Sequence, residues 1–460
     1  MRKTKPEIRI IFIGILLIFA AFLFFPLIVL LIRSFETNQG YNLSNYLKAI
    51  RNPELLQAFM NSMKVSSVTA FITTILAFLL AYAVHGTRLY KPVKKGIKIG
   101  IMVPMLLPTI TYGFAIMYSY GNQGLMTKLL GKSWFDIYGF NGLLIGYVVY
   151  TLPAAFLLIN NSFVYIDKKF IIVSKLMGDG TFRSFMNTIF RPLSGAIGGA
   201  FVLSFILSFT DFGIPASIGG TYTVVSTQLY QVMLGSIPDF NQGAVIAILM
   251  LVPAVFGVLL LSYLEKFNFH YDKAAETELI PNKVRDISFG VISMVILTAM
   301  SSIFLIMFIA PFLTSYPFDY TFTLRHITSV FESSDLLNVY KNSLFVALFT
   351  AIFGTIITYS AALVNARTAI KGKTSFDMIS MITNTVPGMV LGLSYLLLFN
   401  GSNLKGTFFI IIICNIVHYF TTYEGAEDYV ENYLEPQYTK VLIAQGLDIW
   451  SRFVIYQRWS

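Results

Sequence analysis

The chain has 460 residues, of which 56% are hydrophobic and 12% are charged, with a formal net charge of +10. A soluble domain is roughly one quarter charged, so this composition argues against a soluble enzyme or a nucleic-acid-binding protein and predicts a membrane protein. The single cysteine, Cys414, excludes an intramolecular disulfide.

Long apolar runs alternate with polar segments along the whole chain. A bilayer-spanning helix needs about 20 predominantly apolar residues, and ten runs approach or reach that length. They are Ile10–Ile32, Val65–Val84, Ile99–Tyr120, Gly142–Val164, Leu193–Phe209, Ala244–Leu264, Ile287–Leu313, Ser343–Val364, Met378–Phe399 and Thr407–Tyr423. The first run is too long for a signal peptide and is interpreted as a retained helix. The predicted fold is therefore an all-α polytopic membrane protein with about ten transmembrane helices.

The distribution of Lys and Arg predicts the orientation. If the N-terminus is cytoplasmic and the spans alternate in direction, 24 of the 33 Lys and Arg residues fall in cytoplasmic segments. This bias over short loops is the positive-inside pattern. The positive charge is thereby explained without a nucleic-acid partner, and the lipid bilayer is the expected surrounding.

One polar stretch, Asp167–Leu193, lies between two apolar runs and occurs a second time at Glu435–Ser460. Glu435 and Gly446 stand where Asp167 and Gly178 stand in the first copy, and Trp450 matches Phe182. An internal repeat is a strong indication of architecture. Three further pairs of segments match: Leu43–Tyr46 with Leu324–Ile327, Phe59–Ser62 with Tyr340–Ser343, and Leu107–Pro108 with Val386–Pro387.

These two stretches resemble the EAA loop of ABC-importer permeases: an acidic residue, ten residues, a glycine, and an aromatic-rich arm. The first copy has Ile171–Val173 where the family usually has alanines. The resemblance implies that each loop forms a coupling helix for a separate ATPase subunit. The residues that it assigns to ATPase coupling are Asp167, Gly178 and Phe182 in the first copy. The corresponding residues in the second copy are Glu435, Gly446 and Trp450. The alternative is an amphipathic helix on the membrane surface, with the acidic residues favoured by the helix dipole.

The repeat divides the chain into two predicted permease units. Residues 1–270 form the first, with six helices and the coupling loop 167–193, and residues 271–285 form a cytoplasmic linker. Residues 286–460 form the second, with four helices and the coupling loop 435–460. Its last two helices are missing relative to the first unit, so we expect a truncated sequence, with a natural ten-helix variant as the alternative.

The sequence predicts no catalytic residues, no cofactor and no metal site. The Gly-rich nucleotide-binding loop GxxxxGK[ST] is absent from the sequence, so the chain is not expected to be an enzyme, and ATP hydrolysis would come from a separate subunit. Asp211, near the end of a span, is a candidate for the substrate pathway because ionisable groups at membrane depth are usually functional. The alternative for Asp211 is a helix-end residue at the external interface.

The double length and the two loops resemble fused permeases that import ferric iron, 2-aminoethylphosphonate or thiamine, with polyamine permeases as more distant relatives. The resemblance implies a multi-pass permease of the bacterial inner membrane that works by alternating access. Its partners would be two copies of an ABC ATPase subunit and an extracytoplasmic substrate-binding protein. The competing interpretations are a secondary transporter with internal repeats and an inactive truncated permease.

Overall fold

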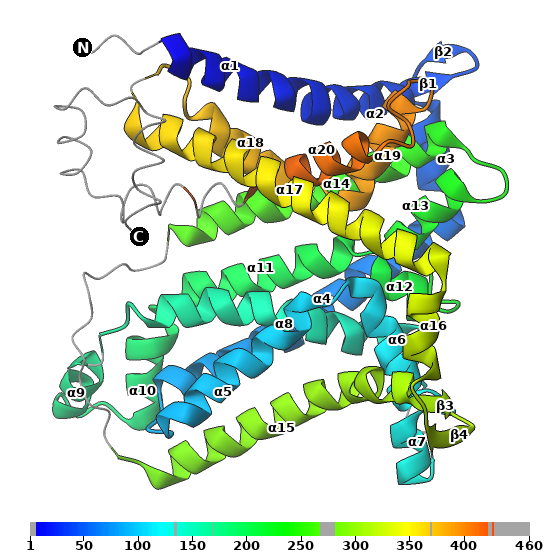
Figure 1. Cartoon of the computed structure of the whole chain (residues 1–460). Helices are drawn as coiled ribbons and strands as arrows, with labels where there is room; N and C mark the ends of the chain where they lie inside the picture. The colour runs from blue at the N-terminus through cyan, green and yellow to red at the C-terminus, as the bar shows by residue number, and fades with distance from the viewer. Residues whose placement is uncertain are drawn as a thin grey trace, which may run out of the picture. The chain divides into compact units, whose positions relative to one another are not determined.

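The computed structural model describes residues 6–132, 136–167, 169–266, 281–368, 370–421 and 426. This part of the chain is almost entirely helical, with two short β-hairpins (Figure 1). The predicted all-α class is confirmed.

The elements of the first repeat begin with a leading span. It comprises α1 (Pro6–Phe19), the π-helical turn η1 (Ala20–Phe24) and α2 (Phe25–Phe35), followed by the hairpin β1 (Glu36–Thr37) and β2 (Gly40–Tyr41). Next come α3 (Ser44–Arg51), α4 (Pro53–His85), α5 (Lys91–Met102), η2 (Val103–Leu106), α6 (Thr109–Tyr120), α7 (Leu125–Leu130) and α8 (Phe140–Phe163). The repeat continues with α9 (Lys169–Leu176), α10 (Thr181–Phe185), η3 (Met186–Phe190), α11 (Ser194–Thr210), α12 (Gly213–Ile218), α13 (Val225–Leu234) and α14 (Phe240–Glu265).

The second repeat follows the same order as far as the structure describes it. It comprises α15 (Lys283–Ile309), η4 (Ala310–Phe312), β3 (Leu313–Ser315), β4 (Asp319–Phe322), α16 (Arg325–Glu332) and α17 (Ser334–Arg367). The last elements are α18 (Ser375–Thr385), α19 (Gly388–Phe399), α20 (Phe408–His418) and η5 (Tyr419–Thr421).

Each predicted apolar run coincides with a helix or a bent helix pair. Six helices in the described residues are long and apolar enough to cross a membrane, three bent pairs add up to three more spans, and the shorter α20 lies within the tenth run. Asparagine and aspartate side chains begin several of the long helices. Asn52 accepts hydrogen bonds from the backbone N–H groups of Glu54 and Leu55 at the start of α4, and Asp239 caps α14 in the same way.

Two of the bent pairs break at corresponding prolines. The helices before and after Pro108 meet at 105°, and those before and after Pro387 meet at 99°. A proline disfavours the helical conformation of the residue before it. Leu107 (φ −101°, ψ 140°) and Val386 (φ −78°, ψ 115°) are accordingly extended. The predicted match between these two segments therefore corresponds to a helix break at a proline that both repeats contain.

The chain divides into two compact units, residues 31–337 and residues 1–30 with 338–460. In the 31–337 unit, α4 packs against α8 and α11 through small and hydroxyl side chains, as is common between membrane helices. The buried ones on α4 include Ser66, Thr69, Thr73, Ala77 and Ala81. The hydroxyls of Thr73 and Thr151 lie 3.0 Å apart and join α4 to α8.

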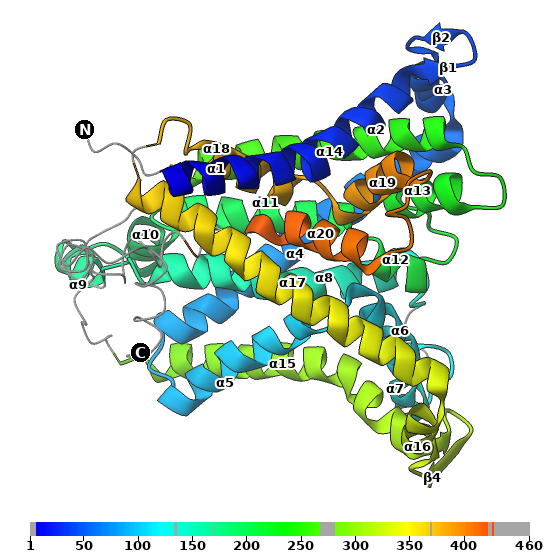
Figure 2. The ribbon, with the colours of Figure 1, turned by 45° about the horizontal axis from the view of Figure 1, so that its top comes forward.

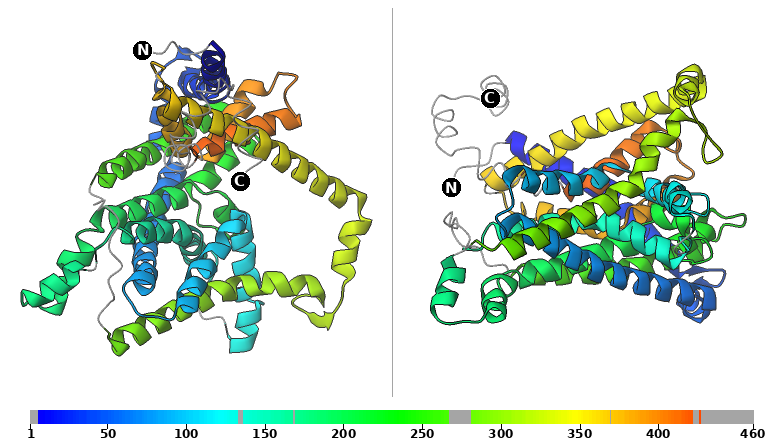
Figure 3. Two further views of the ribbon diagram at one scale, coloured as in Figure 1. Left: turned by 60° about the vertical axis from the view of Figure 1, so that its left-hand side comes forward. Right: turned by 90° about the horizontal axis from the view of Figure 1, so that it is seen from below.

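The leading span of each repeat packs against helices of the other repeat. In the unit formed by the two ends of the chain, Phe12 contacts Phe376 and Phe19 contacts Phe420, with ring centroids 5.3 Å and 4.4 Å apart. In the 31–337 unit, α15 packs against α4, α5 and α6, as Figure 3 shows. The predicted sequence boundary at 271–285 lies largely outside the described residues and stays a prediction.

Candidate functional site

The first candidate coupling loop lies at one end of the 31–337 unit. Figures 1 and 2 both show α9 and α10 at this end, while α12 and α13 lie at the opposite end. This placement agrees with the predicted alternation, in which Asp167–Leu193 and the segment 210–243 belong to opposite sides of the membrane.

Asp167 stands at the N-terminus of α9. Its Oδ1 atom accepts a hydrogen bond from the backbone N–H of Lys169 at 2.9 Å. A side-chain acceptor at this position satisfies one of the free N–H groups of the first helical turn, and its negative charge interacts favourably with the positive end of the helix dipole. The acidic residue thus has a structural role as a cap, and its role in ATPase coupling stays a prediction.

Gly178 forms the turn between α9 and α10. Its φ of +81° lies in the left-handed region, which residues with a Cβ atom rarely adopt. No heavy atom lies within 4 Å of the position that a Cβ would take. The backbone conformation, and not a lack of space, therefore requires glycine here.

Asp179 holds the two arms of this turn together, a role that sequence reasoning missed. Its carboxylate accepts a hydrogen bond from the Ser174 hydroxyl at 2.8 Å and pairs with the Arg183 guanidinium at 3.2 Å. Its backbone N–H donates to the carbonyl of Ser174 at 3.1 Å. Ser174 belongs to α9 and Arg183 to α10, so one side chain fixes the angle between the helices. The available signal was the spacing of Asp179 and Arg183, which is the i,i+4 distance of a helical ion pair.

The tip of the loop is apolar and exposed. Leu176, Met177 and Phe182 keep 82%, 79% and 75% of their surface accessible. Phe185, on the same short helix as Phe182, points inward, with its ring centroid 6.1 Å from that of Phe78 and 6.0 Å from that of Tyr82 on α4. The loop is therefore anchored on α4 by one aromatic side chain and presents the other to its surroundings.

Asp211 follows the last residue of α11 and fixes the next helix. Its carboxylate accepts hydrogen bonds from the backbone N–H of Ile214 at 2.9 Å and from the side chain of Thr109. Its carbonyl accepts a hydrogen bond from the Ser226 hydroxyl at 2.7 Å. Burial raises the pKa of the Asp211 carboxyl to about 6, and these hydrogen bonds limit the rise. Asp211 thus joins α12 to the residue after the Pro108 break, and its role in a substrate pathway stays a prediction.

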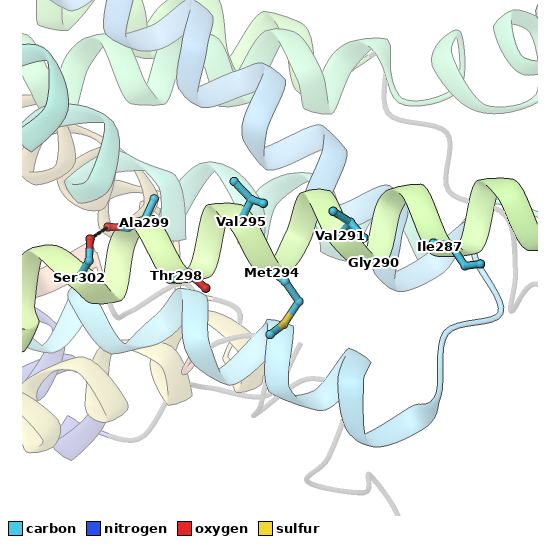
Figure 4. Close-up of a pocket in the computed structure, with 8 residues that line it drawn as sticks. All are labelled: Ile287, Gly290, Val291, Met294, Val295, Thr298, Ala299 and Ser302. Carbon is cyan, nitrogen blue, oxygen red and sulfur yellow. Dashed lines mark hydrogen bonds between the residues drawn. The ribbon is translucent and has the colours of Figure 1, made fainter. Parts of the chain in front are cut away.

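An open recess of about 650 Å³ runs along α15 (Figure 4). Its lining comes from α15 alone, and Thr298 and Ser302 supply its hydroxyl groups. The Ser302 hydroxyl donates to the carbonyl of Ala299 at 2.7 Å. Among the described residues only this one helix lines the recess, so the recess does not support a substrate site. Among the described residues, no three His, Cys, Asp or Glu side chains are grouped so that they could hold a metal ion.

Comparison with known proteins concerns the segment that contains Asp167–Leu193 and Asp211. Residues 73–270 match the family described as the binding-protein-dependent transport system inner membrane component. The matched range contains the whole coupling stretch and Asp211. This segment is a permease domain of that family. The chain is accordingly a multi-pass protein of the bacterial inner membrane.

Relatives of the permease match it beyond this domain. It is 24% identical to the putative ferric transport system permease protein FbpB 1 of Haemophilus influenzae, over 91% of this chain and 68% of that protein. It is also 24% identical to the ferric transport system permease protein FbpB of Actinobacillus pleuropneumoniae, over 88% of this chain and 61% of the relative. The thiamine transport system permease protein ThiP of Haemophilus influenzae is 28% identical over 43% of this chain and 38% of that protein. The permease therefore spans about two thirds of the length of the two ferric transport relatives.

The second candidate coupling stretch of the chain cannot be compared with the first. Glu435, Gly446 and Trp450 all lie outside the described residues. Their correspondence with Asp167, Gly178 and Phe182 rests on the sequence repeat.

Proposed function

We propose that this chain is the membrane subunit of an ATP-driven importer and moves a small solute inward by alternating access. The observation that carries the proposal is the rigid apolar tip of the α9–α10 loop. Leu176, Met177 and Phe182 are exposed there, while the Asp179 contacts and the packing of Phe185 hold the turn. An exposed aromatic side chain on a rigid knob is suited to fill an apolar pocket on a partner.

The route from this tip into the helix bundle is short. α10 continues through the π-helical turn η3 and then meets α11 at a bend of 67°. α11 packs against α4, α8 and α14. A displacement of the tip by an ATPase subunit would therefore tilt a central helix of the bundle, which is the rigid-body kind of conformational change.

The proposed partners are supported by the exposed first loop, by its repeat in the sequence and by the matched family. One ATPase subunit would bind at 167–193 and a second copy at 435–460, and an extracytoplasmic binding protein would deliver the solute. ATP hydrolysis would be performed by the separate ATPase subunits.

Ferric iron is the proposed substrate, followed by phosphonate, thiamine or a polyamine. The names of the first two relatives, which are ferric transport permeases, support this order. The external segment 210–243 contains no Lys or Arg, which weighs against a pathway for an anionic phosphonate there.

The proposal is tested by reconstituting the tagged chain in lipid nanodiscs with candidate ATPase subunits encoded near its gene. We expect an ATPase to bind, and its ATP hydrolysis to rise when the binding protein and its ligand are added. Solute transport in proteoliposomes without an ATPase would instead support a secondary transporter. Binding of an ATPase without any stimulation would support an inactive truncated permease.

A further inference from the structure

Two short helices, α3 and α16, occupy equivalent places in the two repeats. Each follows a leading span and a β-hairpin, and each precedes a long helix. Both belong to the 31–337 unit, and both lie at the end of it opposite α9 and α10 (Figures 1 and 2). The sequence match between Leu43–Tyr46 and Leu324–Ile327 falls at their starts, and transport coupling gives it no role.

The polarity of α3 is the reverse of that of a helix on a water-soluble surface. Its polar side faces the protein: the Asn45 amide donates to the carbonyl of Glu36 at 2.8 Å, and the Tyr46 hydroxyl lies 2.7 Å from the Ser34 hydroxyl. Its apolar side faces outward, with exposed fractions of 60% for Leu43, 54% for Leu47 and 63% for Ile50. These three residues recur at positions i, i+4 and i+7, so they form one stripe.

The second copy, α16, also exposes apolar side chains, but its polar side chains are exposed as well and none of its residues is buried. The His326 ring on α16 lies 3.1 Å from the carbonyl of Thr314 on the neighbouring hairpin. Leu324, which directly precedes α16, and Phe331 on α16 are 51% and 67% exposed. The hairpin adds two exposed phenylalanines, Phe318 at 76% and Phe322 at 74%.

The depth of these helices can be judged from the long helix that follows α3. α4 has 33 residues, which corresponds to about 50 Å at 1.5 Å per residue. The hydrocarbon core of a bilayer is only about 30 Å thick. α4 is therefore longer than the core is thick, and its start, which precedes the apolar run Val65–Val84, lies outside the hydrocarbon together with α3. Two exposed cations, Lys48 and Arg51, stand on α3 close to the apolar stripe, and Arg325 begins α16.

We infer that α3 and α16 are interfacial anchors that lie in the phospholipid headgroup region of the external leaflet. Their apolar stripes enter the boundary between headgroups and acyl chains, and the neighbouring cations meet lipid phosphates. Exposure of these apolar side chains to water is unfavourable, and the inward hydrogen bonds of Asn45 and Tyr46 hold α3 with its apolar stripe facing outward. The anchors would hold the external ends of both leading spans at a fixed depth. This inference does not depend on the proposed transport function.

The test measures the depth of spin labels on the full chain in liposomes of phosphatidylethanolamine and phosphatidylglycerol. Cys414 is replaced by serine, because it is the only cysteine, and single cysteines are introduced as Leu47→Cys and Phe331→Cys. The controls are Gln39→Cys on the first hairpin and Glu332→Cys on α16, both exposed polar positions. Ile50→Cys repeats the measurement on α3, so that a local distortion by one label is recognised.

We expect labels at Leu47, Ile50 and Phe331 to collide with oxygen more often than with a water-soluble nickel complex. The controls should show the opposite ratio. If the labels at the apolar positions matched the controls, the stripes would face water and the inference would be overturned. Protection from both reagents would mean that another protein covers the stripes, which would also overturn it.

Discussion

Replacing Gly178 by alanine tests whether the shape of the coupling turn controls ATPase binding. Gly178 has a φ of +81°, and a Cβ atom in the left-handed region costs about 1–2 kcal/mol. If only the observed turn binds the ATPase, this cost lowers the population of the competent turn, and the apparent affinity falls by up to roughly 5–30-fold. Gly178→Asn should have a smaller effect, because asparagine tolerates this conformation better than other non-glycine residues.

The chain offers a matched control two residues away. Gly180 has a φ of −62° and a ψ of 158°, which any residue adopts, and no atom lies within 4 Å of its prospective Cβ. Gly180→Ala should therefore leave affinity unchanged. A fluorophore on Thr181→Cys in the Cys414→Ser background would report ATPase binding at this loop, separately from the second one. Equal weakening by both alanine variants, or no weakening by Gly178→Ala, would refute the reasoning.

Three further predictions concern other side chains of the 31–337 unit. Phe182→Ala should weaken ATPase binding without lowering thermal stability, whereas Phe185→Ala should lower the melting temperature, because only Phe185 packs against α4. Asp179→Ala should reduce ATPase affinity while Arg183→Ala has a smaller effect, because the Arg183 side chain is 77% exposed and its ion pair is screened. For Asp211, whose pKa is raised to about 6, burial favours the protonated form of the folded protein. Stability should fall as pH rises from about 4 to 6, and Asp211→Asn should remove this dependence in pH-resolved melting curves. Asp211→Ala should also lose the hydrogen bond from the Ile214 backbone N–H at the start of α12, at a cost of about 1 kcal/mol. Identical pH profiles for wild type and Asp211→Asn would contradict the burial of this carboxyl.

Features that depend on local chemistry were predictable from the sequence. The ten apolar runs were found because the bilayer imposes a minimum apolar length. The two helix breaks fall at the matched segments Leu107–Pro108 and Val386–Pro387, because proline restricts the residue before it. The turn at Gly178 falls at the glycine of the repeated stretch, because glycine alone adopts its backbone conformation without strain. In each case the physical cause acts within a few residues of the sequence signal.

Features that depend on distant partners were not predictable in this way. Asp179 was visible as a charge, but its contact with Ser174 depends on how α9 and α10 fold back on each other. The composition of α3 shows an apolar stripe, but only the hydrogen bonds of Asn45 and Tyr46 reveal that its polar side faces inward. Nothing in the sequence near Asp211 indicated that Thr109 would be its partner.

The leading helices show why a sequence repeat and a packing unit need not coincide. The repeat is a property of chain order, and it places residues 6–35 with the first permease unit. Packing is a property of complementary surfaces, and the aromatic side chains of α1 and η1 meet Phe376, Phe399 and Phe420 of the second repeat. The Tyr395 hydroxyl also donates to the carbonyl of Phe22. α15, the leading helix of the second repeat, completes the exchange, because its Phe304 packs 5.2 Å from Tyr112 of the first. Each repeat thus supplies a helix that buries apolar surface of the other, and the short polar connection between them joins two mutually dependent halves.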